Sequence, residues 1–349
     1  MQFLNIYKKR TAELQRKIPT ENLDVFDYAD SIYNEEFDAI FSFYQEVLIR
    51  NSKFGIKPSI LFFNADRNIN AKAVKNGKHF IISFNAGTVV GLIQMFREYE
   101  DIILNENQQI FESSLDNPIN ELMYQFAVHY TFYHEMAHLI QKSTFLELGM
   151  DENLTSNHDF SELRHLLELD ADEYSAISLG AHIIQYADNL FGATVTKDEI
   201  EELIVIGCSA ILLYLLSFKT NRLDIYYEEH SHPHPIIRLN WIIFAIISYC
   251  ENAYRKKAIQ MSFNSGELMN KVLIFSRANI DKFFDGKDLI SNYFQTIQQE
   301  ALNIIRYYNK YEEFKKDNRK LAVHKWNLLA SNKNQICKSI FIAKMKLGF

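Results

Sequence analysis

The stretch His134-Glu135-Met136-Ala137-His138 reads H-E-x-x-H inside a segment whose apolar residues recur at helical spacing. Residues four apart lie on one face of a helix, so both imidazoles can face one metal ion while Glu135 projects beside them. Neutral imidazoles bind zinc, and three protein ligands leave a fourth position for water, whose pKa zinc lowers to roughly 7. The stretch therefore predicts a helix with two zinc ligands, and a third ligand must come from elsewhere.

The predicted helix starts at Asn117 and Pro118, because asparagine is a good N-cap and proline is tolerated at the first helical position. Apolar residues then follow one stripe, which ends at the two histidines. Two unpaired imidazoles on an apolar face would be costly to bury, whereas metal-bound imidazoles are satisfied. This favours a metal site over a pair of core histidines.

Two acidic residues, Glu168 and Asp172, supply candidates for the third ligand in the helical pattern of residues 160–180. They are four apart, so one carboxylate can reach the metal while the other accepts the outer N–H of a liganding imidazole. A solvated acidic face is the alternative. The metzincin pattern does not fit, because Gln141 and Thr144 stand where it has Gly and His.

Three histidines within five positions, His230, His232 and His234, follow in a stretch that Pro233 and Pro235 keep out of a helix interior. Their spacing fits a second metal site, a hydrogen-bond donor to a transition state, or ordinary loop polarity.

Short apolar runs at 60–63 and 80–84, with the turn signal Asn76-Gly77 between them, predict a small sheet that contains a hairpin. Helical spacing recurs at 88–104, and a polar linker is expected at 105–117. We therefore predict an α+β protein that is mostly α-helical, with the small N-terminal sheet packed on the H-E-x-x-H helix.

Three regions are expected along the chain. Residues 1–57 form a helical N-terminal region, residues 58–250 the domain with the metal site, and residues 251–349 a helical C-terminal region.

Composition and charge narrow the class of partner. Of 349 residues, 48% are hydrophobic, which supplies a sizeable core. The net charge of -7 argues against a nucleic-acid binder, and no clear nucleic-acid motif is present. From Arg306 to Phe349, however, 11 basic residues stand against 3 acidic ones. A solvated helical face explains this excess, and an anionic partner such as RNA or lipid is the alternative.

The sequence indicates a cytoplasmic protein. Its three cysteines are widely spaced and odd in number, as in reduced proteins, and no secretory signal is visible. Leu203 to Phe218 is uncharged and mostly apolar, but its 16 residues fall short of the roughly 20 that a spanning helix needs. A buried core helix is favoured there over a membrane span.

Three blocks carry a resemblance to a known family. In chain order they are His134-Glu135-x-x-His138, then Glu168-x-x-x-Asp172, then His232-Pro233 followed by Arg238. They resemble the gluzincin peptidases of the HtpX and CAAX-prenyl-protease type, in which an Arg stands six residues after the last His, and this selects His232 over His234. Asn70-Ala71 resembles the Asn-Ala on the family's edge strand beside the cleft.

The resemblance implies a zincin core and an endopeptidase that cleaves a protein or peptide substrate inside the cell. The implied roles are zinc ligands for His134, His138 and Glu168, general base for Glu135, imidazole partner for Asp172, transition-state contact for His232, ion-pair partner for Arg238, and substrate-binding edge strand for Asn70 and Ala71. Clear paired spanning helices are lacking, so soluble relatives and the similar Lit-type phage-exclusion peptidases are nearer in character.

Two other classes of function stay open. One is a regulatory or toxin-like interaction protein whose zinc site is mainly structural, although a structural site has no need of a residue such as Glu135. The other is a membrane-associated protease, which would depend on Leu203 to Phe218.

Overall fold

The computed structural model describes residues 3–18, 24–98, 102–145, 160–218, 224–284, 289–319 and 321–325. Its elements are α1 (Leu4–Gln15), η2 (Tyr28–Asp30), α2 (Asn34–Arg50), η3 (Asn51–Phe54), β1 (Ser59–Asn64), β2 (Ala71–Asn76), β3 (His79–Asn85), α3 (Ala86–Ile93), η4 (Gln94–Glu98), α4 (Glu106–Glu112), α5 (Ile119–Phe145), α6 (Glu162–Leu190), η7 (Gly192–Thr194), α7 (Lys197–Leu216), α8 (Pro235–Lys256), α9 (Ser265–Phe284) and α10 (Leu289–Asp317). The fold is mostly helical with one small mixed sheet, as predicted. Residues 326–349, which hold much of the basic C-terminal segment, lie outside the described residues.

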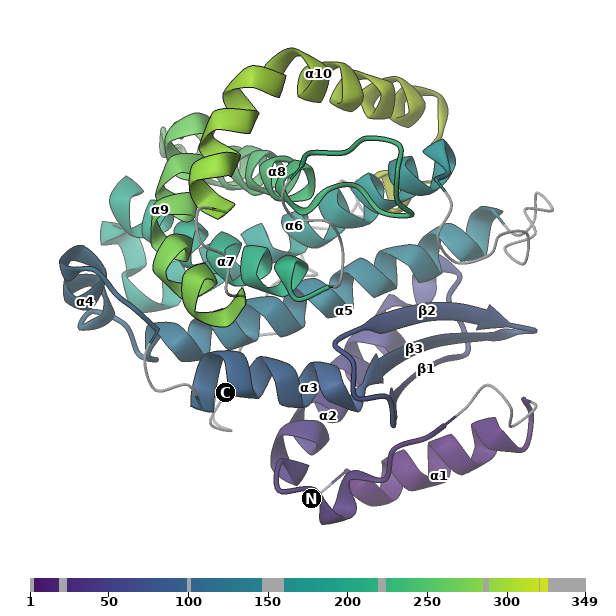
Figure 1. Ribbon diagram of the computed structural model, residues 1–349. Coiled ribbons are helices and arrows are strands. Elements are labelled where there is room, and N and C mark those ends of the chain that lie inside the picture. The colour runs from purple at the N-terminus through teal and green to yellow at the C-terminus, as the bar shows by residue number, and fades with distance from the viewer. Residues whose placement is uncertain are drawn as a thin grey trace.

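Helix α5 lies between the sheet and the other large helices (Figure 1). Strands β2 and β3 pack on one side of it, and α6 and α7 pack against it from the helical side. Helix α8 covers α6 and α7, while α9 and α10 form the outermost layer. Figure 1 shows α1 and α2 near the N-terminus beside the sheet, where both contact β1. Every layer of the fold is thus built outward from α5.

The sheet has the strand order β1-β3-β2, with β1 parallel and β2 antiparallel to β3. The turn at Gly77, which has a positive φ of 55°, joins β2 to β3 as a hairpin. The backbone around Val25 covers the outer edge of β1, where Val25 bridges Asn64. Among the described residues no strand pairs with the outer edge of β2.

The backbone of β2 offers hydrogen-bonding groups at this open edge. Asn85 donates its backbone N–H to the carbonyl of Asn70, and in an antiparallel pair such bonds involve every second residue. The backbone groups of Ala71 and Ala73 therefore point away from β3. Lys142, on the same helix as the H-E-x-x-H stretch, donates to the carbonyl of Ala73. The open edge thus lies against α5 one turn beyond His138.

The helices around α5 begin at residues that satisfy their free N–H groups. Ser161 caps α6, and Thr196 with Glu199 forms a capping box at the start of α7. His234 caps α8, where Pro235 takes the first helical position. These local signals fix where each helix starts.

The structure differs from the sequence-based prediction between residues 88 and 117. The helix expected at 88–104 starts at Ala86, ends at Ile93 and continues as a π-helical turn to Glu98. The expected polar linker contains the short helix α4, which begins with a capping box between Asn105 and Gln108. A seven-residue helix with mainly polar residues gives no apolar periodicity to detect.

Helix α7 contains all but the last two residues of the apolar segment Leu203 to Phe218. The residues from Leu203 to Leu216 are buried. Among the described helices, α8 is the one long and apolar enough to cross a membrane, and 61% of its most apolar stretch is buried within the protein. The core helix of a soluble protein can be equally long and apolar.

Gly87 allows α3 to pack closely against the loop that leads into β2. Its N–H donates to the carbonyl of Asp66, and an added Cβ would stand 2.0 Å from the carbonyl oxygen of Arg67. Backbone atoms cannot yield as a flexible side chain does, so only glycine fits here.

We expect Gly87→Ala to lower the free energy of unfolding by about 1–3 kcal/mol or more, because the loop must shift. Urea unfolding followed by circular dichroism measures this change. Gly266→Ala is the matched control, since its Cβ would meet Asn264 Oδ1 at an ordinary 3.4 Å. Equal effects of the two substitutions would contradict the close packing inferred at Gly87.

Candidate metal centre

Helices α5 and α6 pack together and bring His134, His138 and Glu168 to one point. One ligand atom from each of these residues lies within 4.8 Å of the others. His134 and Glu168 are buried, and His138 is partly exposed, with 17% of its side chain accessible. The three residues predicted as ligands from the sequence thus form a group that could hold a metal ion.

The distances within this group fit a tetrahedral cation. His134 Nε2 and His138 Nε2 are 3.1 Å apart. Glu168 Oε2 lies 3.1 Å from His134 Nε2, and Oε1 lies 3.3 Å from His138 Nε2. Ligands about 2.0–2.1 Å from a tetrahedral zinc stand about 3.3 Å apart. Glu168 Oε2 is also buried with no hydrogen bond, as expected of an atom that serves a metal.

Asp172 fixes the orientation of the first histidine. Its Oδ1 lies 3.0 Å from His134 Nδ1 and accepts a hydrogen bond from the N–H of that nitrogen. The lone pair of His134 Nε2 is then directed at the other two ligands. This is the arrangement expected for a carboxylate that holds a metal-binding imidazole.

Arg238 and Tyr130 hold Asp172 in turn. The guanidinium donates from Nε to Oδ2 at 2.9 Å and from a terminal nitrogen to Oδ1 at 2.8 Å. The Tyr130 hydroxyl donates to Oδ1 at 2.6 Å and accepts from Arg238 at 2.9 Å. All three side chains are buried. Arg238 therefore forms the expected ion pair, and its partner is Asp172, the carboxylate that contacts the candidate ligand His134.

Burial and charge act in opposite directions on these carboxyl groups. Burial raises the pKa of Asp172, but the charge and hydrogen bonds of Arg238 outweigh it and hold that pKa below its usual range. Burial also raises the pKa of Glu168, and the facing imidazoles of His232 and His138 lower it well below the ordinary value. Both groups are therefore anionic at neutral pH, which suits them to a site for a cation.

His134 shows the same attraction for positive charge. Burial lowers its pKa, but the facing carboxylates of Asp172 and Glu168 raise it more, to about 9 overall. The two carboxylates that stabilise a proton on this ring stabilise a metal cation at the same place.

Gln141 holds the second histidine, a role that the sequence did not reveal. Its Oε1 lies 2.8 Å from His138 Nδ1, and its Nε2 donates to Asp170 Oδ2 at 2.7 Å and to the Leu167 carbonyl at 2.9 Å. Sequence reasoning used Gln141 only to exclude a metzincin. Its position three residues after His138, on the same helical face, was the available signal.

The histidine-rich stretch places one imidazole at the site. His232 Nε2 lies 3.5 Å from Glu168 Oε1, and half of its side chain, 52%, is exposed. His234 is buried and caps α8, accepting the Ile236 N–H through Nδ1 at 3.2 Å. The structure thus brings His232, and not His234, to the candidate ligands.

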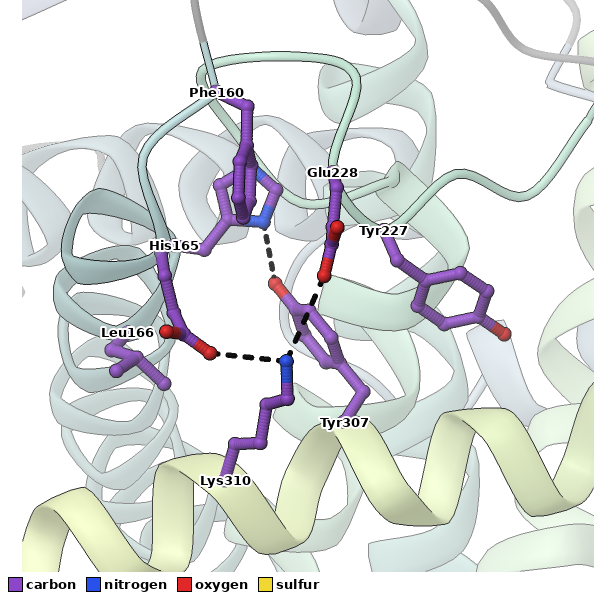
Figure 2. A pocket seen from close by; sticks show the side chains of 8 residues that line it. Phe160, His165, Leu166, Tyr227, Glu228, Tyr307 and Lys310 are labelled. Carbon is purple, nitrogen blue, oxygen red and sulfur yellow. Dashed lines mark hydrogen bonds and ion pairs between the residues drawn. The ribbon is translucent and has the colours of Figure 1, made fainter.

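His165, one turn before Glu168 on α6, connects the loop of residues 228–234 to helix α10 (Figure 2). Its Nε2 donates to the His230 carbonyl at 2.6 Å, and its Nδ1 accepts from the Tyr307 hydroxyl at 2.7 Å. Figure 2 also shows Lys310 of α10 paired with Glu228 of the same loop, 3.7 Å away. The cavity between these residues holds about 10 Å³, the lower limit for one water molecule. The contacts therefore position the loop and leave no room for a ligand.

Glu135 and the edge strand complete the set of predicted site residues. Glu135 is nearly buried on α5 between the two histidines. Burial is the main reason that the pKa of the Tyr214 hydroxyl is raised, and the charge of Glu135 adds to it, so the carboxylate lies in the neighbourhood of this hydroxyl of α7. Asn70 precedes β2 and Ala71 begins it, at the open edge of the sheet.

Comparisons of the chain with protein-family models, curated proteins and solved structures gave no match. The resemblance to gluzincin peptidases therefore rests on the three sequence blocks alone, and the geometry described above is the independent observation beside it.

We expect Asp172→Ala to lower the free energy of unfolding by about 3–5 kcal/mol, because it leaves the buried Arg238 charge without its partner. Chemical denaturation measures this loss. The matched control is Asp188→Ala, which removes an ion pair with Lys257 whose side chains are 38% and 39% exposed, and which costs about 0–1 kcal/mol. Similar losses for both variants would show that burial of the Asp172 pair is unimportant.

We expect His138→Ala to abolish stoichiometric zinc binding, because two ligands cannot hold the ion as three do. Metal analysis of the purified protein after dialysis against zinc measures the loss. His79→Ala, which changes a partly exposed histidine at the start of β3, serves as the control and retains zinc. Unchanged metal content in His138→Ala would remove this residue from the ligand set.

Proposed function

We propose that the protein is a zinc-dependent metalloendopeptidase with a zincin core of the gluzincin type. One observation carries the proposal: two imidazole nitrogens and a carboxylate meet at 3.1–3.3 Å on α5 and α6, with Glu135 adjacent on the ligand helix. Two histidines and a glutamate are a donor set of catalytic zinc sites, which keep one coordination position open.

Each candidate site residue has a separate role in the proposed hydrolysis. Zinc, when bound by His134, His138 and Glu168, supplies a Lewis acid that polarises a peptide carbonyl and lowers the pKa of water to roughly 7. Glu135 accepts the proton of the attacking water and later delivers it to the leaving amine. Its place beside the ligand His134 makes it the nearest candidate base in sequence.

His232 would contact the reacting carbonyl. Its half-exposed imidazole lies 3.5 Å from Glu168 Oε1, which supports a role beside the candidate ligands. A donated hydrogen bond from this ring would stabilise the negative charge that develops on the carbonyl oxygen. The loop that carries it is fixed through His165 and Tyr307.

The open edge of β2 supplies a binding surface for an extended peptide. The carbonyl of Ala71 points outward, and the side-chain oxygen of Asn70 accepts the Ala71 N–H at 2.9 Å. An added strand would donate to the Ala71 carbonyl and would replace the Asn70 side chain as the acceptor of the Ala71 N–H, as in other cases of strand addition to a sheet edge. Because Lys142 joins this edge to α5, the added strand would run past the candidate metal ligands.

A mainly structural zinc site is the weaker alternative. Structural sites are closed by four ligands and favour cysteine, whereas the group found among the described residues has three ligands and no cysteine. Cys208 and Cys250 are both buried in helices α7 and α8.

We expect Glu135→Gln to keep its zinc and to lose about 10²–10⁴-fold in peptide cleavage, because an amide cannot accept the proton. The substrate is found by mapping new protein N-termini in cells that express the wild type or this variant. Glu106→Gln, an exposed change on α4, is the control and cleaves as the wild type does. Full cleavage by zinc-loaded Glu135→Gln would refute the mechanism.

A further inference from the structure

We propose that segment 321–325 is a positioning element of the metal centre, which acts on the ligand His138 through Asp170 and Gln141. The proposal rests on the function proposed above and adds a part of the chain, near residue 320, that no sequence motif connects with the site. It follows from the direction of each hydrogen bond between the segment and the histidine.

The first link is the carboxylate of Asp170. Ala322 donates its backbone N–H to Oδ2 at 2.9 Å, and Val323 donates to Oδ1 at 3.2 Å. Both oxygens are therefore acceptors, and a fully buried side chain has no water to change this role. Burial raises the pKa of Asp170, and the two backbone donors with Gln141 oppose that rise.

The second link is the amide of Gln141. Asp170 Oδ2 and the Leu167 carbonyl accept hydrogen bonds, so the group that faces them must be the NH₂ of Gln141. The amide cannot turn over without placing its oxygen against these acceptors. Gln141 Oε1 is therefore fixed in the direction of His138 Nδ1.

The third link is the imidazole. An amide oxygen only accepts, so His138 must carry its proton on Nδ1, which is 2.8 Å from Gln141 Oε1. Its Nε2 is then left with a lone pair, and this is the atom that faces His134 Nε2 at 3.1 Å. The backbone of segment 321–325, acting together with the Leu167 carbonyl, thus favours the tautomer that binds a metal.

The segment is firmly seated on both helices of the site. Leu321 and Val323 are buried against Leu167 of α6 and Phe314 of α10. Lys325 donates to the Ser143 hydroxyl of α5 at 3.2 Å. The segment therefore spans the helices that carry the candidate ligands.

A substitution that removes one link tests the chain of hydrogen bonds. In Asp170→Leu, the side chain offers no acceptor to Ala322, Val323 or Gln141. The Gln141 amide then keeps the Leu167 carbonyl as an acceptor but loses the bond through which segment 321–325 holds it towards His138. We expect zinc affinity to fall about 10–100-fold, measured by chelator competition on the purified full chain.

A conservative substitution keeps the bonds. In Asp170→Asn, the amide oxygen at the Oδ2 position still accepts from both Ala322 and Gln141, so zinc affinity stays near the wild-type value. An equal loss of zinc affinity in Asp170→Leu and Asp170→Asn would overturn the proposed chain of hydrogen bonds. Gln125→Glu, at a residue of α5 bonded to Glu121, is the control and leaves zinc affinity unchanged.

Nuclear magnetic resonance of the zinc-loaded wild type tests the tautomer even if Asp170→Leu fails to fold. We expect His138 to coordinate through Nε2 with its proton on Nδ1, and Ala322→Pro, which deletes one donor at the tolerated first helical position, to shift that proton's resonance. Coordination through Nδ1, or unchanged zinc affinity in folded Asp170→Leu, would overturn this proposal alone. A wild type that binds no zinc would overturn both this proposal and the proposed function.

Discussion

The buried pair of Asp172 and Arg238 is the interaction on which the arrangement of helices depends. Taking two charges out of water costs several kcal/mol for each ion, and only well-formed hydrogen bonds offset that cost. The guanidinium makes two bonds to the carboxylate, and Tyr130 and His134 satisfy its Oδ1 as well. Because these groups come from α5, α6 and α8, the pair fixes the relative positions of all three helices. The candidate ligands are held in place by the same bonds.

The parts of the site that the sequence predicted are those set by helical spacing. His134 with His138, and Glu168 with Asp172, are each four residues apart, and a helix alone places each pair on one face. The small sheet and its hairpin were likewise predictable from apolar runs and a turn signal. The parallel pairing of β1 with β3 was not, since it depends on packing between residues far apart in the chain.

The remaining parts of the site depend on contacts that no local pattern encodes. No local pattern singles out Asp170, and its partner Ala322 lies 152 positions further along the chain. His230, His232 and His234 look alike in spacing, and only the fold shows that one faces Glu168 while another caps a helix. The short helix α4 lay in what the sequence marked as a linker, because its stability comes from its cap and not from an apolar stripe.

The distance along the chain between Asp170 and Ala322 also orders events during synthesis. A ribosome makes the chain from its N-terminus, so α5 and α6 emerge long before residue 322 exists. Until then the carboxylate of Asp170 lacks both of its backbone donors, and the Gln141 amide is held by Asp170 and the Leu167 carbonyl alone. The last interactions of the centre to form are therefore those from segment 321–325, which delays a finished metal site until Val323 has been translated.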